Sequence, residues 1–132
     1  NLFNEKNNGL LVQTLISKKL VNSVHDVSSG GILLTLSEMC IAGKIGAKIK
    51  VPKNSAGPHE YLFGEDQSRY LIEVNEKNKK EVCELLEKNS IYYEIVGKTQ
   101  KDSLNLDKEF DIKLSDLNEL NTFWFKDYFE EN

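Results

Sequence analysis

The chain has 132 residues, 39% of them apolar, and a formal net charge of −4. This length suits one globular domain with a real core, and the scattered lysines form no basic surface for nucleic acid or an anionic membrane. No apolar run approaches the roughly 18 residues that span a bilayer, and residues 1–9 lack the layout of a signal peptide, so we expect a cytoplasmic protein. Because the chain opens at Asn1 and its only methionine is Met39, we expect a piece of a longer protein.

The first elements are predicted to be a helix, a strand, a turn and a second helix. Apolar residues at helical spacing predict a helix over residues 10–21. A short strand over 21–27 and a turn over 28–31 follow. Residues 32–43 repeat the helical spacing, and we expect this helix to stop at Gly43, because glycine commonly terminates helices.

The middle of the chain is predicted to hold two strands, a loop and a helix. Residues 46–51 alternate small or apolar residues with lysine, which is typical of a half-exposed strand. The prolines at the two ends of 52–58 indicate a loop. We expect a strand over 69–74 and then a helix over 75–89, capped by Asn75.

The last third is predicted to hold three strands and a closing helix. We expect a strand over 91–98, and two short strands within 103–114 around a turn at 107–109. A helix over 115–129, capped by Ser115, closes the chain. The order of elements predicts an α+β domain with helices packed on a mixed sheet, related to ferredoxin-like folds. Such scaffolds carry enzymes as well as ligand sensors, so the fold leaves the function open.

Small polar residues crowd the predicted turn between strand and helix. Free backbone N–H groups and hydroxyls at a helix N-terminus favour anions, and one carboxylate there is suited to Mg²⁺ held together with phosphate oxygens. The residues concerned are Asp26, Ser28, Ser29, Gly30 and Gly31. The alternative is that a serine caps the helix and the glycines only make the turn.

A second polar cluster directly precedes the strand at 69–74. Arg69 is suited to clamp a phosphate or carboxylate, and Glu65 and Gln67 to contact amides or hydroxyls. An ordinary loop is the alternative. We name no catalytic residue, because an isolated histidine such as His25 is usually a satisfied structural residue.

Two motifs, HDVSSGGILLTLSEMCIAGKIGAKI and LFGEDQSRYLIEV, resemble the C-terminal region of PurL-type phosphoribosylformylglycinamidine synthases. The family pattern is H-D-x-S-D-G-G followed by L-F-G-E-S-Q-x-R-Y-L, so Ser29 and Asp66 depart from it. The resemblance is strong over residues 22–75 and weaker beyond them. It implies a domain like the C-terminal domain of aminoimidazole ribonucleotide synthetase. The histidine and double glycine of the first motif imply the second of two such domains in a PurL-type chain, with 1–132 as one C-terminal-type domain.

The resemblance implies a reaction that this chain does not complete. The family converts formylglycinamide ribonucleotide to formylglycinamidine ribonucleotide with ATP, Mg²⁺ and glutamine-derived ammonia. We therefore expect the fragment alone to be inactive and to hold no cofactor tightly. The implied partners are the remaining domains of the parent chain, a glutamine amidotransferase subunit and a small accessory subunit. Nucleic acid and membrane are not expected as partners.

The resemblance leaves the role of the two polar clusters open. In the family the working contacts fall mainly in the first copy of this domain, so the clusters here either line a degenerate or auxiliary nucleotide site or support a domain interface. A stand-alone anion-binding or regulatory module, or a domain of a selenophosphate synthetase, are the alternative functions. Self-association of the fragment is also expected, with the aromatic run Phe123–Phe125 as a contributor, unless these rings pack in the core.

Overall fold

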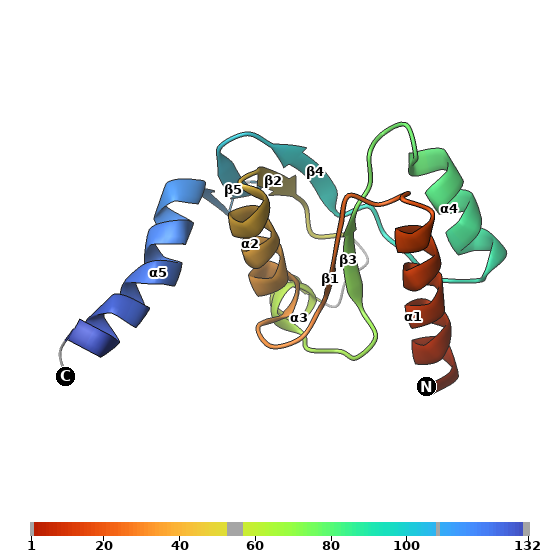
Figure 1. Ribbon diagram of the computed structural model, residues 1–132, viewed down its shortest axis with the longest axis horizontal. Helices are drawn as coiled ribbons and strands as arrows, with labels where there is room; N and C mark the ends of the chain where they lie inside the picture. Colours follow the sequence, from red (N-terminus) through yellow and green to blue (C-terminus); the bar gives the residue numbers. More distant parts are fainter. Residues whose placement is uncertain (1, 53–56, 108, 131–132) are drawn as a thin grey trace. The chain divides into compact units, whose positions relative to one another are not determined.

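The computed structural model describes residues 2–52, 57–107 and 109–130. They form two compact units, one of Asn1–Thr35 with His59–Ile95 and the other of Leu36–Pro58 with Val96–Asn132. Figure 1 shows the helices and strands, with colours that follow the chain from red at the N-terminus to blue at the C-terminus. Among the described residues, no helix is both long enough and apolar enough to cross a membrane.

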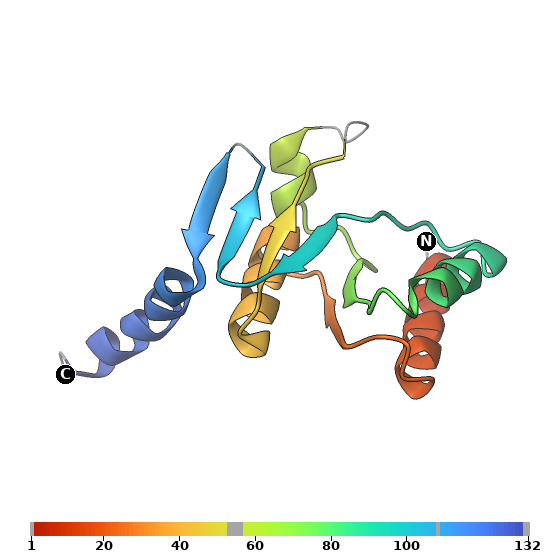
Figure 2. The same cartoon turned by 90° about the horizontal axis from the view of Figure 1, so that it is seen from above.

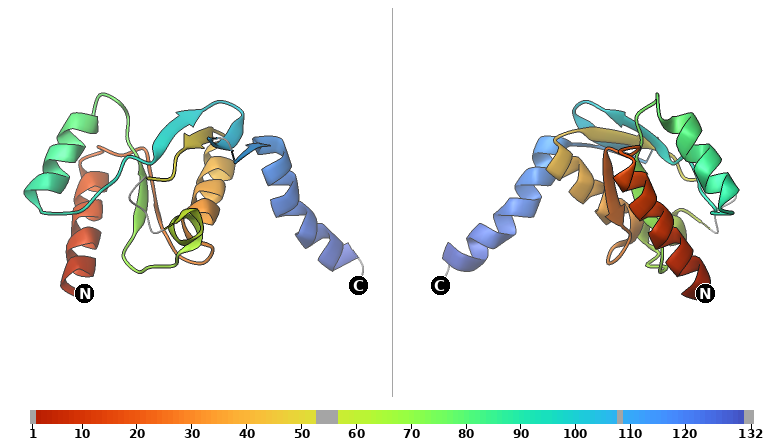
Figure 3. Two further views of the ribbon diagram at one scale, coloured as in Figure 1. Left: turned by 180° about the vertical axis from the view of Figure 1, so that it is seen from behind. Right: turned by 45° about the vertical axis from the view of Figure 1, so that its right-hand side comes forward.

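The first unit combines helices with a two-stranded antiparallel ladder. Its elements are α1 (Leu2–Ser17), β1 (Ser23–Asp26), α3 (Pro58–Phe63), β3 (Tyr70–Glu73) and α4 (Lys79–Lys88). Strands β1 and β3 pair from Ser23 opposite Glu73 to Asp26 opposite Tyr70. Helices α1 and α4 lie side by side (Figure 3). The core between them is formed by Leu11, Leu15, Leu20, Val82 and Leu86.

The second unit is built on a mixed sheet. Its strands are β2 (Gly46–Ile49), β4 (Gly97–Gln100), β5 (Ser103–Leu106) and β6 (Phe110–Lys113). They lie in the order β4-β2-β5-β6 (Figure 2). The pair β2–β5 is parallel, and the two outer pairs are antiparallel. Helix α5 (Leu114–Glu130) follows β6 directly.

One face of this sheet is apolar because strand residues alternate between the two faces. Ala47 and Ile49 on β2, and Leu104 and Leu106 on β5, are all at least 95% buried. The C-terminal part of α2 (Gly31–Gly43) adds the buried Leu36 and Cys40 to this unit. The mixed sheet with packed helices confirms the predicted α+β class.

Most predicted strands are present, but one is largely wrong. No strand covers residues 91–96; β4 begins at Gly97, where pairing with Ile49 starts. Gly97 lies so close to β2 that a Cβ there would come within 2.9 Å of the Ile49 Cα, and just before it the carbonyl of Val96 accepts the N–H of Lys50 at 2.9 Å. Residues 91–95 resemble a strand in sequence but have no partner strand among the described residues.

The helix ends differ from prediction in several places. Helix α1 begins at Leu2 rather than residue 10 and ends at Ser17, because Lys19 has a positive φ of 56° that turns Leu20 into the core. Helix α3 was not predicted, since six residues are too few to show a helical period. The predicted loop at 52–58 lies partly outside the described residues, and Pro58 opens α3 instead of closing that loop.

The two predicted caps are also wrong. Helix α4 begins at Lys79, and Asn75 instead accepts a hydrogen bond from the N–H of Lys77 at 3.2 Å in the preceding turn. Ser115 lies inside α5, where its hydroxyl donates to Asp116 at 2.8 Å. In both cases a residue type that often caps helices does not predict where the helix begins.

Candidate functional site

The two polar clusters meet in the first unit. The backbone N–H of Gly30, just before α2, donates a hydrogen bond of 2.8 Å to Oε1 of Glu65, which follows α3. A carboxylate of the chain itself therefore occupies part of the positive end of α2. The sequence left open whether this turn accepts an anion or only caps the helix, and in the structure a side chain from the second cluster lies against it.

The double glycine is required by the backbone and by close packing. Gly30 has a φ of +77° and Gly31 a φ of +67°, which other residues rarely adopt. A Cβ on Gly31 would come within 2.5 Å of the carbonyl oxygen of Leu62 in α3. The glycines thus let α3 approach the turn, which is sufficient reason for their presence without a bound ligand.

The two serines and Asp26 point toward solvent. Ser28 and Ser29 are exposed, and the carbonyl of Ser28, rather than a hydroxyl, accepts the N–H of Gly31 at 3.1 Å. The side chain of Asp26 is 70% exposed and lies 3.6 Å from Nδ1 of His25. Its backbone carbonyl accepts a bond of 3.5 Å from the buried Thr35 hydroxyl. These side chains are the accessible polar groups of the first cluster.

Arg69 is engaged within its own loop. Its guanidinium donates to the carbonyl of Gly64 and lies 3.9 Å from the Asp66 carboxylate, and its own carbonyl accepts the N–H of Val27 at 2.8 Å. Nε of Arg69 is buried without a hydrogen-bond partner in the described residues. Arg69 thus shapes the loop from residue 64 to 69, and Gln67 on that loop is exposed.

Two residues that contact this region could not be predicted from the sequence. The side-chain amide of Asn8, on α1, donates to the carbonyl and hydroxyl oxygens of Ser68 at 3.0 and 3.1 Å. Tyr61 on α3 is half-buried, and burial together with the nearby Glu94 carboxylate raises the pKa of Tyr61 to about 12. Both residues lie far in sequence from the groups they contact, so no local motif predicts them.

The described residues do not by themselves form a metal site. No group of three or more His, Cys, Asp or Glu side chains in the described part of the chain is placed to hold an ion. Asp26 can contribute one ligand, whereas Mg²⁺ needs six oxygens, several of them from substrate and water. The predicted role of Asp26 toward Mg²⁺ therefore requires further oxygen ligands beside the carboxylates of the described residues.

Comparison with known proteins identifies relatives of the whole chain. Residues 1–107 match the family described as "AIR synthase related protein, C-terminal domain". Over 130 residues the chain is 43% identical to the phosphoribosylformylglycinamidine synthase subunit PurL of Pelagibacter ubique, covering 98% of this chain and 18% of that protein. The same subunit of Rhodopseudomonas palustris is 36% identical over 124 residues, covering 94% and 17%. The chain thus spans less than a fifth of the length of these relatives.

Solved structures show the same fold. Thermotoga maritima PurL complexed with FGAR matches with a TM-score of 0.75 at 20% identity, over 86% of this chain and 21% of that one. The same protein complexed with ATP matches with a TM-score of 0.69 at 20% identity, over 80% and 20%. PurLQS from T. maritima gives 0.75 at 21% identity, over 86% and 21%. These likenesses show the fold, and the family match over residues 1–107 confirms the predicted relation to the C-terminal domain of AIR synthase related proteins.

Proposed function

Because the chain belongs to the family of AIR synthase related proteins, as their C-terminal domain, we propose that it works as the second such domain of a PurL-type phosphoribosylformylglycinamidine synthase. The observation that carries the proposal is the 43% identity to a PurL subunit over 98% of this chain. The complete enzyme would be an ATP-dependent carbon–nitrogen ligase of purine biosynthesis. It would convert formylglycinamide ribonucleotide and glutamine-derived ammonia to formylglycinamidine ribonucleotide.

This domain would support the reaction rather than complete it. Phosphoryl transfer depends on positioning and on charge neutralisation by metal ions and several donors. In the described residues Glu65 and Arg69 are bound to their own chain, and no metal cluster forms. We therefore infer that the domain alone is inactive and that ATP and Mg²⁺ are held mainly by other parts of the enzyme.

The candidate site residues fall into two groups, according to whether they already join other parts of the chain. Glu65, Gly30, Gly31 and Arg69 join the turn to the loop, which supports an architectural role. The other four candidate side chains are exposed and are available to a phosphate or nucleotide from the rest of the enzyme. They are Asp26, Ser28, Ser29 and Gln67.

The partners in this proposal are those that the family resemblance implies. They are the remaining domains of the parent polypeptide, a glutamine amidotransferase subunit and a small accessory subunit, in the cytoplasm. PurLQS from T. maritima is a solved assembly with the same fold in its PurL part, which supports partner subunits. Nucleic acid and membranes have no part in the proposal, since the chain carries a net charge of −4.

A chimera tests the proposed function. The segment of the Pelagibacter ubique PurL subunit that matches this chain is replaced by the chain, and the product is expressed in a purine auxotroph lacking its own subunit. We expect growth without added purine, and ATP-dependent formation of formylglycinamidine ribonucleotide by the purified chimera. The chain alone should show no turnover.

Two controls test whether the inserted segment, correctly folded, is needed for growth. A PurL subunit truncated at the same junction should not restore growth, which shows that the segment is needed. A chimera carrying Gly31→Val should also fail, because the valine side chain would collide with Leu62. A soluble, folded chimera without activity would contradict the proposal and favour a stand-alone module.

A further inference from the structure

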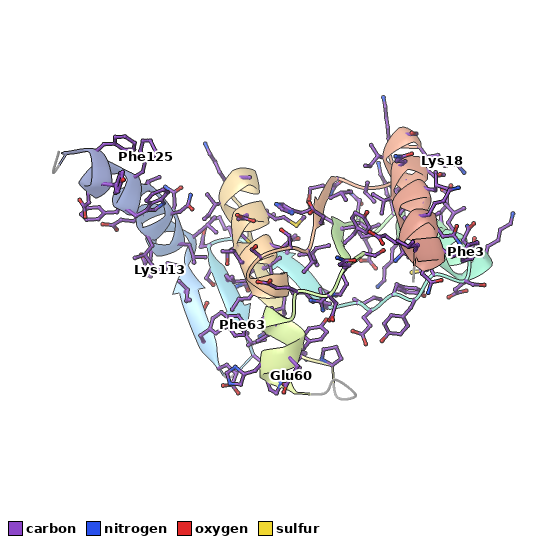
Figure 4. All side chains as sticks on the ribbon, turned by 90° about the horizontal axis from the view of Figure 1, so that it is seen from below. Phe3, Lys18, Glu60, Phe63, Lys113 and Phe125 are labelled. Carbon is purple, nitrogen blue, oxygen red and sulfur yellow. The ribbon has the colours of Figure 1, made fainter. Side chains whose placement is uncertain are left out.

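An open cavity of about 570 Å³ lies within the second unit, whereas the turn and loop of the candidate site belong to the first. Its lining includes Lys44, Lys101, Asp102, Ser103, Asp111 and Lys113. Figure 4 labels Lys113, which lies where β6 passes into α5. Cavities that bind small molecules have volumes of about 300–1,000 Å³, so this one is large enough for a small organic ligand.

Three lysines from different segments of the chain line this cavity. Lys44 directly follows α2, Lys101 lies between β4 and β5, and Lys113 ends β6. All three are exposed, and none forms an ion pair with a carboxylate of the described residues. Positive charges gathered around one cavity repel each other, and a bound anion offsets that repulsion. The lysines therefore favour an anionic ligand.

A serine hydroxyl adds a hydrogen-bond donor beside one of these lysines. Ser103 lies opposite Lys113 in the β5–β6 ladder, so the two side chains are on the same face of the sheet. The side-chain amide of Gln100 donates to the carbonyl and hydroxyl oxygens of Ser103, at 2.9 Å each. Because the Ser103 hydroxyl accepts this bond, its own proton is available to a ligand oxygen.

Backbone hydrogen bonds hold the rim of the cavity in place. The N–H of Leu114, at the start of α5, donates to the carbonyl of Asp102 at 2.9 Å. This bond ties the connection between β4 and β5 to the end of β6. Together with the bonds from Gln100 to Ser103, it fixes the backbone that carries most of the lining, so a ligand would meet a site that is largely formed.

Two aspartates restrict the kind of anion that fits. Asp102 and Asp111 also line the cavity, so its three lysines and two aspartates give a net charge of +1. The carboxylates repel a bare anion, but they accept hydrogen bonds from hydroxyl groups. We propose that the cavity binds a sugar phosphate, whose phosphate group contacts the lysines and the Ser103 hydroxyl and whose sugar hydroxyls contact the aspartates.

An NMR titration of the ¹⁵N-labelled 132-residue chain with glucose 6-phosphate tests the proposal. We expect amide shifts concentrated at residues 101–103 and 113–115, and binding that weakens as salt screens the lysines. Glucose should not bind, because it lacks the anion, and inorganic phosphate should bind more weakly, because it lacks the sugar hydroxyls. The absence of shifts at these residues would overturn the proposal, as would inorganic phosphate binding as tightly as glucose 6-phosphate.

Matched lysine variants locate the phosphate group. Lys101→Gln and Lys113→Gln keep a polar side chain but remove a charged donor, and each should weaken binding by about 5-fold or more. Lys98→Gln removes an exposed lysine of the same sheet that does not line the cavity, and should change binding by less than about 2-fold. Equal effects of all three would overturn the proposal, because they would reflect the overall charge and not the cavity.

An aspartate variant tests the opposite sign. Asp111→Asn removes a negative charge from the lining and should tighten the binding of inorganic phosphate. Weaker binding of inorganic phosphate by this variant would contradict the proposed site. The amide spectrum of each variant shows whether it is folded. The outcome does not depend on the proposed enzymatic function, which the chimera tests separately.

Discussion

The carboxylate of Glu65 and the backbone N–H of Gly30 share a 2.8 Å hydrogen bond, although 35 residues separate them in the sequence. This bond joins the two motifs that resemble the PurL family. It also occupies part of the helix N-terminus that the sequence offered as a candidate anion site. The turn of the first motif and the loop of the second are therefore in contact within the first unit.

Removing this carboxylate should loosen the junction between the motifs. Glu65→Ala leaves the Gly30 N–H without its acceptor, and we expect the free energy of unfolding to fall by about 1 kcal/mol, as for the loss of a helix-terminal acceptor. Glu65→Gln keeps an oxygen acceptor and should cost less than half of that. Urea denaturation measures both. An equal loss in the two variants would mean that the charge of Glu65 stabilises the turn and its hydrogen bond does not.

Two glycines in the first unit should respond to alanine with opposite sign. Gly31→Ala forces a positive φ of 67° on alanine and brings its Cβ within 2.5 Å of Leu62, so we expect a loss of about 2 kcal/mol or more. Gly9→Ala lies within α1, where the nearest atom is the Tyr70 hydroxyl at 3.6 Å, and should stabilise by about 0.5–1 kcal/mol. Thermal unfolding of both variants checks the prediction. Stabilisation by Gly31→Ala would contradict the geometry of the turn.

Asn8 should contribute to stability more than a similar residue on the same helix. Asn8→Ala removes two hydrogen bonds to Ser68, and we expect a loss of about 1 kcal/mol. Asn4→Ala changes an exposed position of α1 and should be neutral or slightly stabilising, since alanine is the better helix former. Both are measured by urea denaturation, and equal effects would show that the bonds to Ser68 do not stabilise the fold.

Alkaline pH should destabilise the chain in part through Tyr61. Burial, with Glu94 nearby, raises the pKa of Tyr61 from 10.0 to about 12 in the folded chain, so folding favours the neutral phenol. Its contribution is fully present below pH 10 and is lost as the pH rises from 10 through 12. Tyr61→Phe should flatten the fall of stability over that range and leave the slope at pH 7–9 unchanged. Identical alkaline profiles for the two proteins would contradict the assignment.

The two cysteines should differ in reactivity. Cys40 is 3% exposed, and burial raises the pKa of its thiol from 9.0 to about 11. Cys83 is half-buried on α4. Iodoacetamide at pH 8 should therefore label Cys83 much faster than Cys40 in the native chain, and both at similar rates in urea, as read by mass spectrometry. Faster labelling of Cys40 would show that the region around α2 opens readily.

The sequence by itself determined the class of the fold, most of the strands and the family. Local patterns were enough for these, because alternation in β2 and apolar spacing in α2 arise from the faces that the elements bury. The motif residues Gly30, Gly31 and Arg69 were also found from sequence, since their spacing is preserved in the resemblance to PurL-type enzymes.

The tertiary structure alone decided what those residues contact. Glu65 meets Gly30, Gly31 makes room for Leu62, and Asn8 holds Ser68, and each contact joins segments that no local rule relates. The same holds for the start of β4, which depends on where β2 offers a partner, and for the exposure of Trp124. A periodic pattern predicts that a helix has an apolar side, but whether its own chain covers that side depends on the packing of the other elements.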